Sequence, residues 1–181
     1  MQVFLVLLFM KKRIAHASIQ PDKFCFSEEN SREVARILAK YPASRKRSAV
    51  LPLLHLVQRQ HENWIPIAAM DHVAQLLGLP VIKVYEVASF YSMFNTAPVG
   101  KHTIRVCRTT PCWLRGSDCL IEAAKRELGI KVGHKTEDNK FSLDEVECLG
   151  ACVSAPVVQI NDDYFENLDE RSFLELLSRL K

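Results

Sequence analysis

Motifs that mark several large classes of enzyme are missing from this sequence. It contains no Gly-x-Gly-x-x-Gly and no phosphate-binding loop, so nothing indicates that the chain itself binds a dinucleotide or a flavin. It contains no Cys-x-x-Cys, the spacing that disulfide-exchange enzymes use. His61-Glu62 lacks the second histidine of a zinc-protease helix. We therefore expect neither nucleotide chemistry nor thiol exchange nor zinc proteolysis from this chain.

Long apolar runs are also missing. Residues 3–10 form an apolar run that is too short to span a bilayer, and the basic residues 11–13 follow it, whereas a secretion signal would place them first. We therefore expect neither a membrane anchor nor the oxidising compartment that disulfides require. We expect translation to start at Met10, and residues 1–26 to form a disordered or mis-started extension outside the folded part.

The composition is that of an ordinary globular protein. The 181 residues are 48% hydrophobic, which suits one compact domain or two small ones with modest cores. The net charge of +3 hides an asymmetry, because residues 1–98 carry 12 basic and 7 acidic side chains whereas residues 99–181 carry 12 and 14. This difference indicates two units with different surfaces, and we place them at residues 27–98 and 99–181.

Residues 27–98 have the pattern of a small helical bundle. Ser27 is expected to cap a first helix that Pro42 ends, and Gly78 is expected to end a third. Apolar residues recur with helical period in all four predicted helices. These are residues 27–41, 50–57, 66–77 and 80–94. Residues 95–100 are the predicted linker.

After the linker the pattern changes to alternating strands and helices. Residues 103–106 alternate polar and apolar and lead directly to Cys107, as a half-buried strand does. A helix from Ser117 or Asp118 to Leu128 is expected next. The later predicted elements are a strand at residues 157–160, a hairpin turn at 161–163 and a last helix capped by Asp169. This order predicts a mixed sheet with cysteine-bearing loops at one end.

Four of the six cysteines form two close pairs, Cys107-x4-Cys112 and Cys148-x3-Cys152. Thiolates spaced in this way converge on a metal centre, and a 2Fe-2S cluster takes two thiolates on each iron. Gly150 lets the backbone of the second pair bend sharply. The backbone N–H groups and hydroxyls of the first loop are candidate donors to the cluster sulfurs. The spacing therefore favours a 2Fe-2S cluster.

Spacing alone leaves other interpretations open. A structural zinc site also uses four cysteines in pairs separated by two to four residues. Inert buried thiols are a further alternative, because cysteine is among the most buried residue types. Cys25 and Cys119 stand outside the pairs and are interpreted as structural. Trp113 follows Cys112 directly, and it suits a shield for the centre, a partner contact or a core residue equally well.

A different class of function is an iron-sulfur redox-sensing DNA-binding regulator. Ala74, Gly78 and Val84 have the offsets of a helix-turn-helix unit. The segment that would enter the groove begins with Pro80 and two apolar residues and then offers Lys83 alone, which is poor chemistry for phosphates or base edges. Two core helices joined by a tight turn explain the same offsets, and the regulator is kept as the alternative.

Four stretches together resemble one protein family. They are AVLPLLHLVQRQ at residues 49–60, VYEVASFYSMF at 84–94, CRTTPC at 107–112 and ECLGAC at 147–152. They resemble the E subunit of bacterial NADH-quinone oxidoreductase, which is the thioredoxin-like iron-sulfur subunit of respiratory complex I. The resemblance covers about residues 26–181.

The resemblance implies an α+β fold, with a small N-terminal helical bundle followed by a thioredoxin-like α/β domain. It implies one 2Fe-2S cluster bound by Cys107, Cys112, Cys148 and Cys152, and no catalytic side chain. The function implied is electron transfer within NADH:quinone oxidoreductase, in which the cluster exchanges electrons with the FMN of a partner flavoprotein subunit. Other peripheral-arm subunits are further expected partners, and no nucleic acid is. The implied location is cytoplasmic, at the membrane only through the complex.

Overall fold

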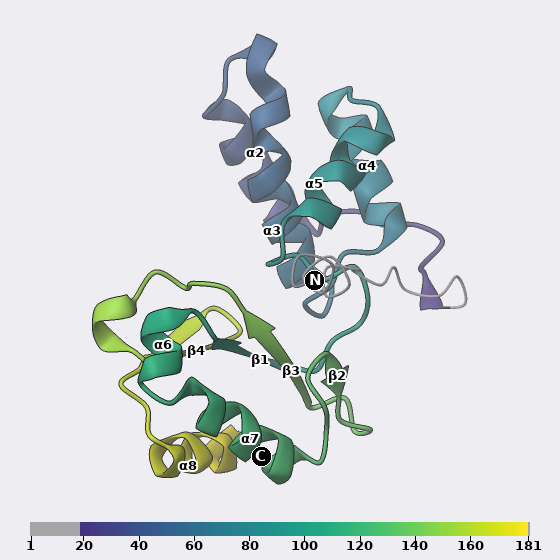
Figure 1. The fold of residues 1–181 in the computed structure, drawn as a ribbon. Helices are drawn as coiled ribbons and strands as arrows, with labels where there is room; N and C mark the ends of the chain where they lie inside the picture. Colours follow the sequence, from purple (N-terminus) through teal and green to yellow (C-terminus); the bar gives the residue numbers. More distant parts are fainter. Residues whose placement is uncertain (1–18, 181) are drawn as a thin grey trace, which may run out of the picture. The chain divides into compact units, whose positions relative to one another are not determined.

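The computed structural model describes residues 19–180 (Figure 1). The chain divides into two compact units on either side of the bond between Pro98 and Val99. Each unit has a hydrophobic core of its own. None of the helices within residues 19–180 combines the length and apolar character that a membrane span requires.

The first unit is a bundle of helices. Its elements are α2 (Glu28–Ala39), the 3-10 helix η2 (Ala43–Ala49), α3 (Val50–Gln60), α4 (Ile67–Leu77) and α5 (Val81–Phe90). All four α-helices predicted from the hydrophobic period are present. The last is shorter than predicted, because Tyr91 adopts an extended backbone and α5 ends at Phe90 instead of Phe94.

The helix ends follow the capping residues of the sequence. Ser27 is the N-cap of α2, and its Oγ accepts a hydrogen bond from the N–H of Asn30 at 3.2 Å. Gly78 takes the left-handed conformation, with φ of +63°, that ends α4. Pro66 and Pro80 stand directly before α4 and α5, where a missing N–H costs nothing to the helix. Local sequence therefore determines where these helices begin and end.

The bundle core lies between α3, α4 and α5. Leu53, Leu54 and Val57 of α3 are fully buried with Val73 of α4 and Val84 of α5. Burying each such side chain stabilises the fold by about 1.5–3 kcal/mol relative to exposure. These residues are the ones that recur at helical spacing in the sequence, so the periodicity identified the inward face.

The chain before α2 packs against the bundle. Phe24 and Phe26 contact the core. The side-chain amide of Gln60, at the end of α3, donates a hydrogen bond of 2.9 Å to the carbonyl oxygen of Cys25. We expected residues 1–26 to lie outside the folded part, and this is wrong for residues 24–26, which pack on the bundle. Residues 1–18, which include the expected start of translation, lie outside the described residues.

The helix pair α4 and α5 has the turn that the helix-turn-helix offsets predicted. The exposed residues near its tip are apolar, with exposed fractions of 38% for Leu76, 40% for Val81 and 61% for Ile82. Lys83 lies beside them, but its Nζ is 2.9 Å from the carboxylate of Glu86. A phosphate-binding helix presents unpaired basic side chains instead, so the geometry favours the interpretation as two packed helices.

The second unit is a five-stranded mixed sheet with helices. Its strands are β1 (His102–Cys107), β2 (His134–Lys135), β3 (Phe141–Val146), β4 (Val157–Ile160) and β5 (Asp163–Glu166), and their order in the sheet is β2-β3-β1-β4-β5. Its helices are α6 (Thr110–Leu114), α7 (Ser117–Leu128), the 3-10 helix η3 (Cys152–Ser154) and α8 (Glu170–Leu180). β1 and β3 are parallel, and every other neighbouring pair is antiparallel.

One face of the sheet is covered by α7 and α8, which lie together on the same side (Figure 1). Ile104 and Val106 of β1 are fully buried on this face, in one core with Leu120 of α7 and with Phe173 and Leu177 of α8. Because strand side chains alternate between faces, Cys107 points away from this core. The apolar alternation of β1 therefore decides on which side of the sheet the first cysteine lies.

Sequence reasoning found part of this unit and missed the strand β3 and three short elements. The predicted strands at 103–106 and 157–160, the turn after Ile160 and the helices ending at Leu128 and beginning after Asp169 are present. The strand β3, the five-residue α6, the two-residue β2 and the three-residue η3 were not predicted. The last three are too short to show a hydrophobic period, so the pattern that finds longer elements has nothing to detect in them.

We predict that Gly100→Ala destabilises the second unit strongly. A Cβ on Gly100 would overlap the backbone carbonyl carbon of Phe141, at the start of β3. Strand backbone cannot move aside as a flexible side chain does, so we expect a loss of about 3 kcal/mol or more, at the upper end of overpacking costs. Urea unfolding of the full chain measures this loss.

Gly133→Ala is the matched control. Its Cβ would meet open space, and the left-handed backbone there, with φ of +77°, limits the expected loss to about 1–2 kcal/mol. Equal unfolding midpoints for the two variants would contradict the predicted role of the close approach at Gly100.

Candidate metal centre

Two neighbouring parallel strands bring the cysteine pairs together. Cys107 is the last residue of β1, and its register partner on β3 is Val146. Cys148 follows Val146 by two residues, so both pairs begin at the carboxyl edge of the same two strands. Loops at the carboxyl ends of parallel strands are where sheets of this kind form their sites. The four cysteines, which span 45 positions from Cys107 to Cys152, therefore meet at one edge of the sheet.

The two loops are also tied to each other at their first residues. The N–H of Arg108 donates a hydrogen bond of 3.0 Å to the carbonyl oxygen of Val146, which continues the ladder of β1 and β3 by one step. The Nη1 of Arg108 lies 2.6 Å from the Oε2 of Glu145. This ion pair is about half exposed on the arginine side, so its contribution is of the surface kind, about 0–1 kcal/mol. The backbone bond fixes the spacing of the loops.

The first pair is buried. Cys107 and Cys112 are each 1% exposed, and they form a small apolar cluster with Ala155 and Val157. Cys112 lies in α6, which starts directly after Thr109 and ends before Gly116. Burial above all, together with the neighbouring Cys107 thiol, raises the pKa of Cys112 to about 11.

Hydrogen bonds lower the pKa of Cys107, the other thiol of the first pair. Burial alone would raise the pKa of Cys107, but hydrogen bonds from Thr109 and from the backbone N–H of Leu149 outweigh burial and lower that pKa. Leu149 belongs to the loop of the other pair. The first pair thus holds one thiol whose pKa is lowered and one whose pKa is raised, and the second loop contributes to that difference.

The second pair is exposed to solvent. The Sγ atoms of Cys148 and Cys152 are 3.4 Å apart. Gly150 lies between them with φ of +84°, a conformation that favours glycine, and its N–H donates to the Sγ of Cys148 at 3.3 Å. This hydrogen bond and one from Cys152 lower the pKa of Cys148, whereas the Cys148 sulfur raises the pKa of Cys152.

The arrangement fits a binuclear cluster. Two sulfurs bound at about 2.3 Å to one tetrahedral metal lie about 3.8 Å apart, close to the separation in the second pair. The sulfurs gather two by two, Cys107 with Cys112 and Cys148 with Cys152, and the pairs are near enough for Cys152 to raise the pKa of Cys112. A 2Fe-2S cluster, with two thiolates on each iron, has this requirement.

The other two cysteines lie elsewhere. Cys25 belongs to the helical unit and Cys119 to the first turn of α7, and both are exposed. The interpretation of these thiols as structural is therefore corrected, since an exposed thiol contributes little to packing. Trp113 is 55% exposed, which excludes the core alternative for this residue.

Sequence reasoning missed part of the surroundings of the sulfurs. It named the first loop as a source of donors, and the backbone N–H of Thr109 donates to the Cys107 sulfur. It did not identify the N–H of Val157, which donates to Cys112, or that of Leu149. No residue type marks a backbone donor, so only the fold reveals these two. The bond between Ala155 and Pro156, beside Val157, is cis.

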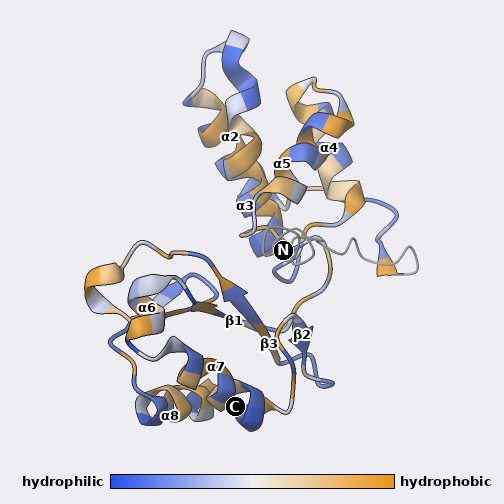
Figure 2. Ribbon diagram, in the orientation of Figure 1, coloured by the Kyte–Doolittle hydropathy of each residue, from blue (hydrophilic) through white to orange (hydrophobic). Residues whose placement is uncertain are grey.

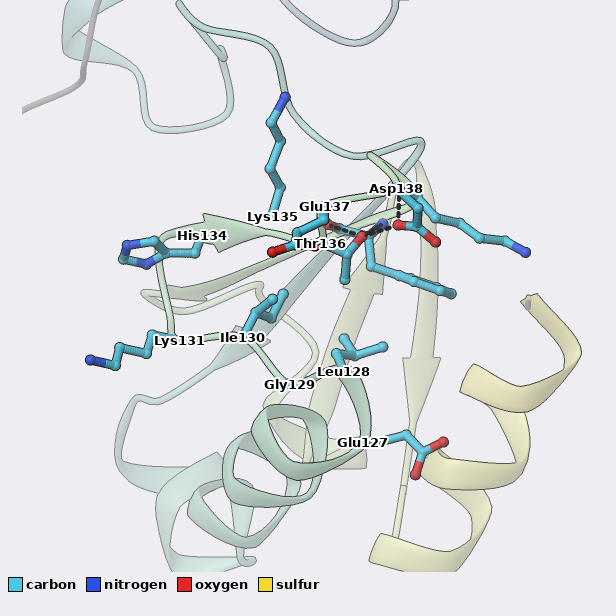
Figure 3. Close-up of a pocket in the computed structure, with 12 residues that line it drawn as sticks. Glu127, Leu128, Gly129, Ile130, Lys131, His134, Lys135, Thr136, Glu137 and Asp138 are labelled. Carbon is cyan, nitrogen blue, oxygen red and sulfur yellow. Dashed lines mark hydrogen bonds between the residues drawn. The ribbon is translucent and has the colours of Figure 1, made fainter.

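A hollow lies away from the cysteines, between the end of α7 and the hairpin of β2 and β3 (Figure 3). Its volume is about 930 Å³, and its wall contains no cysteine. Asp138 accepts hydrogen bonds from the Thr136 hydroxyl and from the N–H of Lys140, which also lower its pKa. Lys131, His134 and Lys135 point away from the centre of the hollow in Figure 3. Its polar groups stabilise the hairpin turn or face solvent, so we assign it no chemistry.

Comparisons with known proteins agree with this geometry. The profile of the thioredoxin-like [2Fe-2S] ferredoxin family matches residues 34–181. A solved chain of an NAD⁺-reducing [NiFe]-hydrogenase superposes with a TM-score of 0.63 at 23% sequence identity, over 72% of this chain. The match spans 22% of the hydrogenase chain, and at this identity it shows a shared fold.

Close relatives come from bacteria and eukaryotes. The chain is 52% identical to the NADH-quinone oxidoreductase E subunit of Rickettsia conorii over 158 residues, which are 87% of this chain and 95% of the relative. It is also 52% identical to the mitochondrial NADH dehydrogenase [ubiquinone] flavoprotein 2 of Dictyostelium discoideum, of which 64% is covered. The family and the thioredoxin-like fold class predicted from the motifs are confirmed: the chain belongs to the thioredoxin-like [2Fe-2S] ferredoxin family and, within it, with the E subunits of NADH-quinone oxidoreductases.

Proposed function

We propose that Cys107, Cys112, Cys148 and Cys152 bind one 2Fe-2S cluster, and that the chain passes electrons between this cluster and the FMN of a partner flavoprotein subunit. Membership of the family makes the chain a 2Fe-2S subunit of an NADH dehydrogenase of complex I type. The observation that carries the ligand set is the meeting of both cysteine pairs at the carboxyl edge of β1 and β3. When bound, the cluster supplies one-electron redox chemistry.

The protein residues have three tasks in this function. The four thiols lose their protons and hold the irons, because the thiolate is the metal ligand. Backbone N–H groups such as that of Gly150 donate to the sulfurs and so stabilise negative charge on them. The apolar cluster around Cys107 and Cys112 keeps water from that side of the centre.

The exposed side of the centre is the side that a partner can approach. Three exposed apolar residues lie within two positions of a proposed cluster cysteine, and we call them the apolar rim. They are Trp113, Leu114 and Val153, with exposed fractions of 55%, 71% and 102%. Hydrophobic residues also colour part of α6 and the segment between β3 and β4 in Figure 2. Exposed apolar residues around a functional group are typical of a protein contact surface.

The occupant that we propose for this surface is the flavoprotein subunit. The chain carries no dinucleotide fingerprint, so a second polypeptide has to supply the NADH and flavin sites of an NADH dehydrogenase. Other peripheral-arm subunits complete the proposed complex. The chain then lies on the cytoplasmic side, at the membrane only through its partners.

Serine substitution separates the ligands from the other two cysteines. We predict that serine at Cys107, Cys112, Cys148 or Cys152 causes loss of the cluster or a strong change in its spectrum, because serine oxygen is a poorer ligand for iron than thiolate sulfur. Iron and sulfide analysis and visible spectra of anaerobically purified variants measure this. Cys25→Ser and Cys119→Ser are the controls, with native iron content and changes in stability below about 0.5 kcal/mol expected for exposed sites. A native spectrum in any of the four, with loss of iron in Cys119→Ser, contradicts the ligand set.

The division of labour between subunits gives a second prediction. The cluster-loaded chain alone is expected not to reduce dyes with NADH, because it has no site for the nucleotide. Adding the flavoprotein subunit is expected to make the paramagnetic resonance signal of the reduced cluster appear with NADH. Rapid NADH oxidation by the pure chain would refute this proposal.

A third prediction concerns the apolar rim. Val153→Asp places a charge on the fully exposed side chain between Cys152 and Ser154, and we expect at least tenfold weaker binding of the flavoprotein subunit, because a desolvated unpaired charge costs about 2 kcal/mol or more in an interface. Val153→Thr, which keeps the shape, is expected to weaken binding less. Affinity is measured by titration with native iron content verified in each variant. Unchanged affinity of Val153→Asp would remove Val153 from the contact surface.

A further inference from the structure

Thr109 stands at a helix start but does not cap the helix. It is the N-cap residue of α6, with the extended backbone that N-caps have, and its side chain makes no hydrogen bond to the first turn. Threonine at this position ordinarily accepts a hydrogen bond from an N–H of that turn. Here its Oγ1 lies 3.3 Å from the Sγ of Cys107 instead.

The chemistry of the ligand decides the direction of this hydrogen bond. A thiol and a hydroxyl can each donate to the other. A cysteine that binds iron is a thiolate, which has no proton and can only accept. The Thr109 hydroxyl is therefore the donor in the loaded protein, and the contact is only partly accessible to water, which strengthens it.

Thr109 also affects the pKa of a cysteine in the other pair. A hydrogen bond with Thr109 is among the causes that lower the pKa of Cys148, after those of Gly150 and Cys152. Backbone N–H groups also donate to these sulfurs, but a side-chain substitution removes only the hydroxyl.

We propose that Thr109 is a positioning residue that raises the reduction potential of the bound cluster by donating its hydroxyl hydrogen bond to the Cys107 sulfur. This inference rests on the ligand set proposed above. The added electron increases negative charge on the sulfurs, so a donor at this place stabilises the reduced state more than the oxidised state. Removing the donor lowers the potential.

The test compares three variants of the full chain, each loaded with its cluster under anaerobic conditions. Thr109→Val keeps the shape and removes the hydroxyl, and Thr109→Ser restores a hydroxyl. Thr110→Val makes the same change at the neighbouring exposed residue. The measured quantity is the midpoint potential, from a redox titration followed by electron paramagnetic resonance, together with iron and sulfide content.

We expect a more negative midpoint potential in Thr109→Val, recovery of most of the shift in Thr109→Ser and the wild-type value in Thr110→Val, with two irons and two sulfides in all. An unchanged potential in Thr109→Val, or an equal shift in Thr110→Val, overturns the proposal. If Thr109→Val loses iron, Thr109→Ala is measured in its place. Loss of iron in both, with retention in Thr109→Ser, also overturns it, because the hydroxyl then serves assembly and not tuning. Failure of the ligand set would appear separately, as a native cluster in the serine variants of the four cysteines.

Discussion

The parallel pairing of β1 with β3 is the constraint on which the rest of the second unit depends. It places Cys107 opposite Val146 and so brings the loops of both cysteine pairs to one edge of the sheet. The pairing itself is held by the core beneath it, where Ile104 and Val106 pack against α7 and α8. A shift of register by one residue would turn these side chains to the opposite face. The hydrophobic core therefore sets the register, and the register sets the geometry of the sulfurs.

The site that results is different on its two sides. Cys107 and Cys112 are buried in an apolar cluster, whereas Cys148 and Cys152 lie at the surface near the exposed Val153. The backbone N–H of Leu149, in the second loop, is among the groups that lower the pKa of Cys107 in the first. Such an arrangement protects a redox centre from water on one side and leaves the other side open to a partner. Surface exposure and hydrogen bonds to sulfur are also the means by which a protein adjusts the potential of an iron-sulfur cluster.

Helix periods, caps and turns could be predicted because they depend on residues close in sequence. Ser27, Gly78 and Asp169 act within a few positions, and the helices they delimit are present. The short elements α6, β2 and η3 could not be predicted, since five, two or three residues carry no period. The family motifs predicted the fold class, because members of a family share a fold. Hydrophobic periodicity reports only local structure and does not predict how the elements pack together. Residues 20–26 were assigned to an extension, and only their contacts with the bundle showed that they are folded.

For the site, the sequence by itself determined the chemistry: two pairs of thiols at spacings suited to iron, and a glycine in the second loop that permits the bend. Spacing could not distinguish a cluster from zinc, nor could it tell the buried pair from the exposed one, because burial depends on what packs around a residue. Only the tertiary structure decided that Trp113 lies at the surface, that Cys25 and Cys119 are exposed, and that Thr109 turns from its helix to a sulfur. The physical reason is that these properties come from contacts between segments far apart in sequence, which exist only after the sheet has formed.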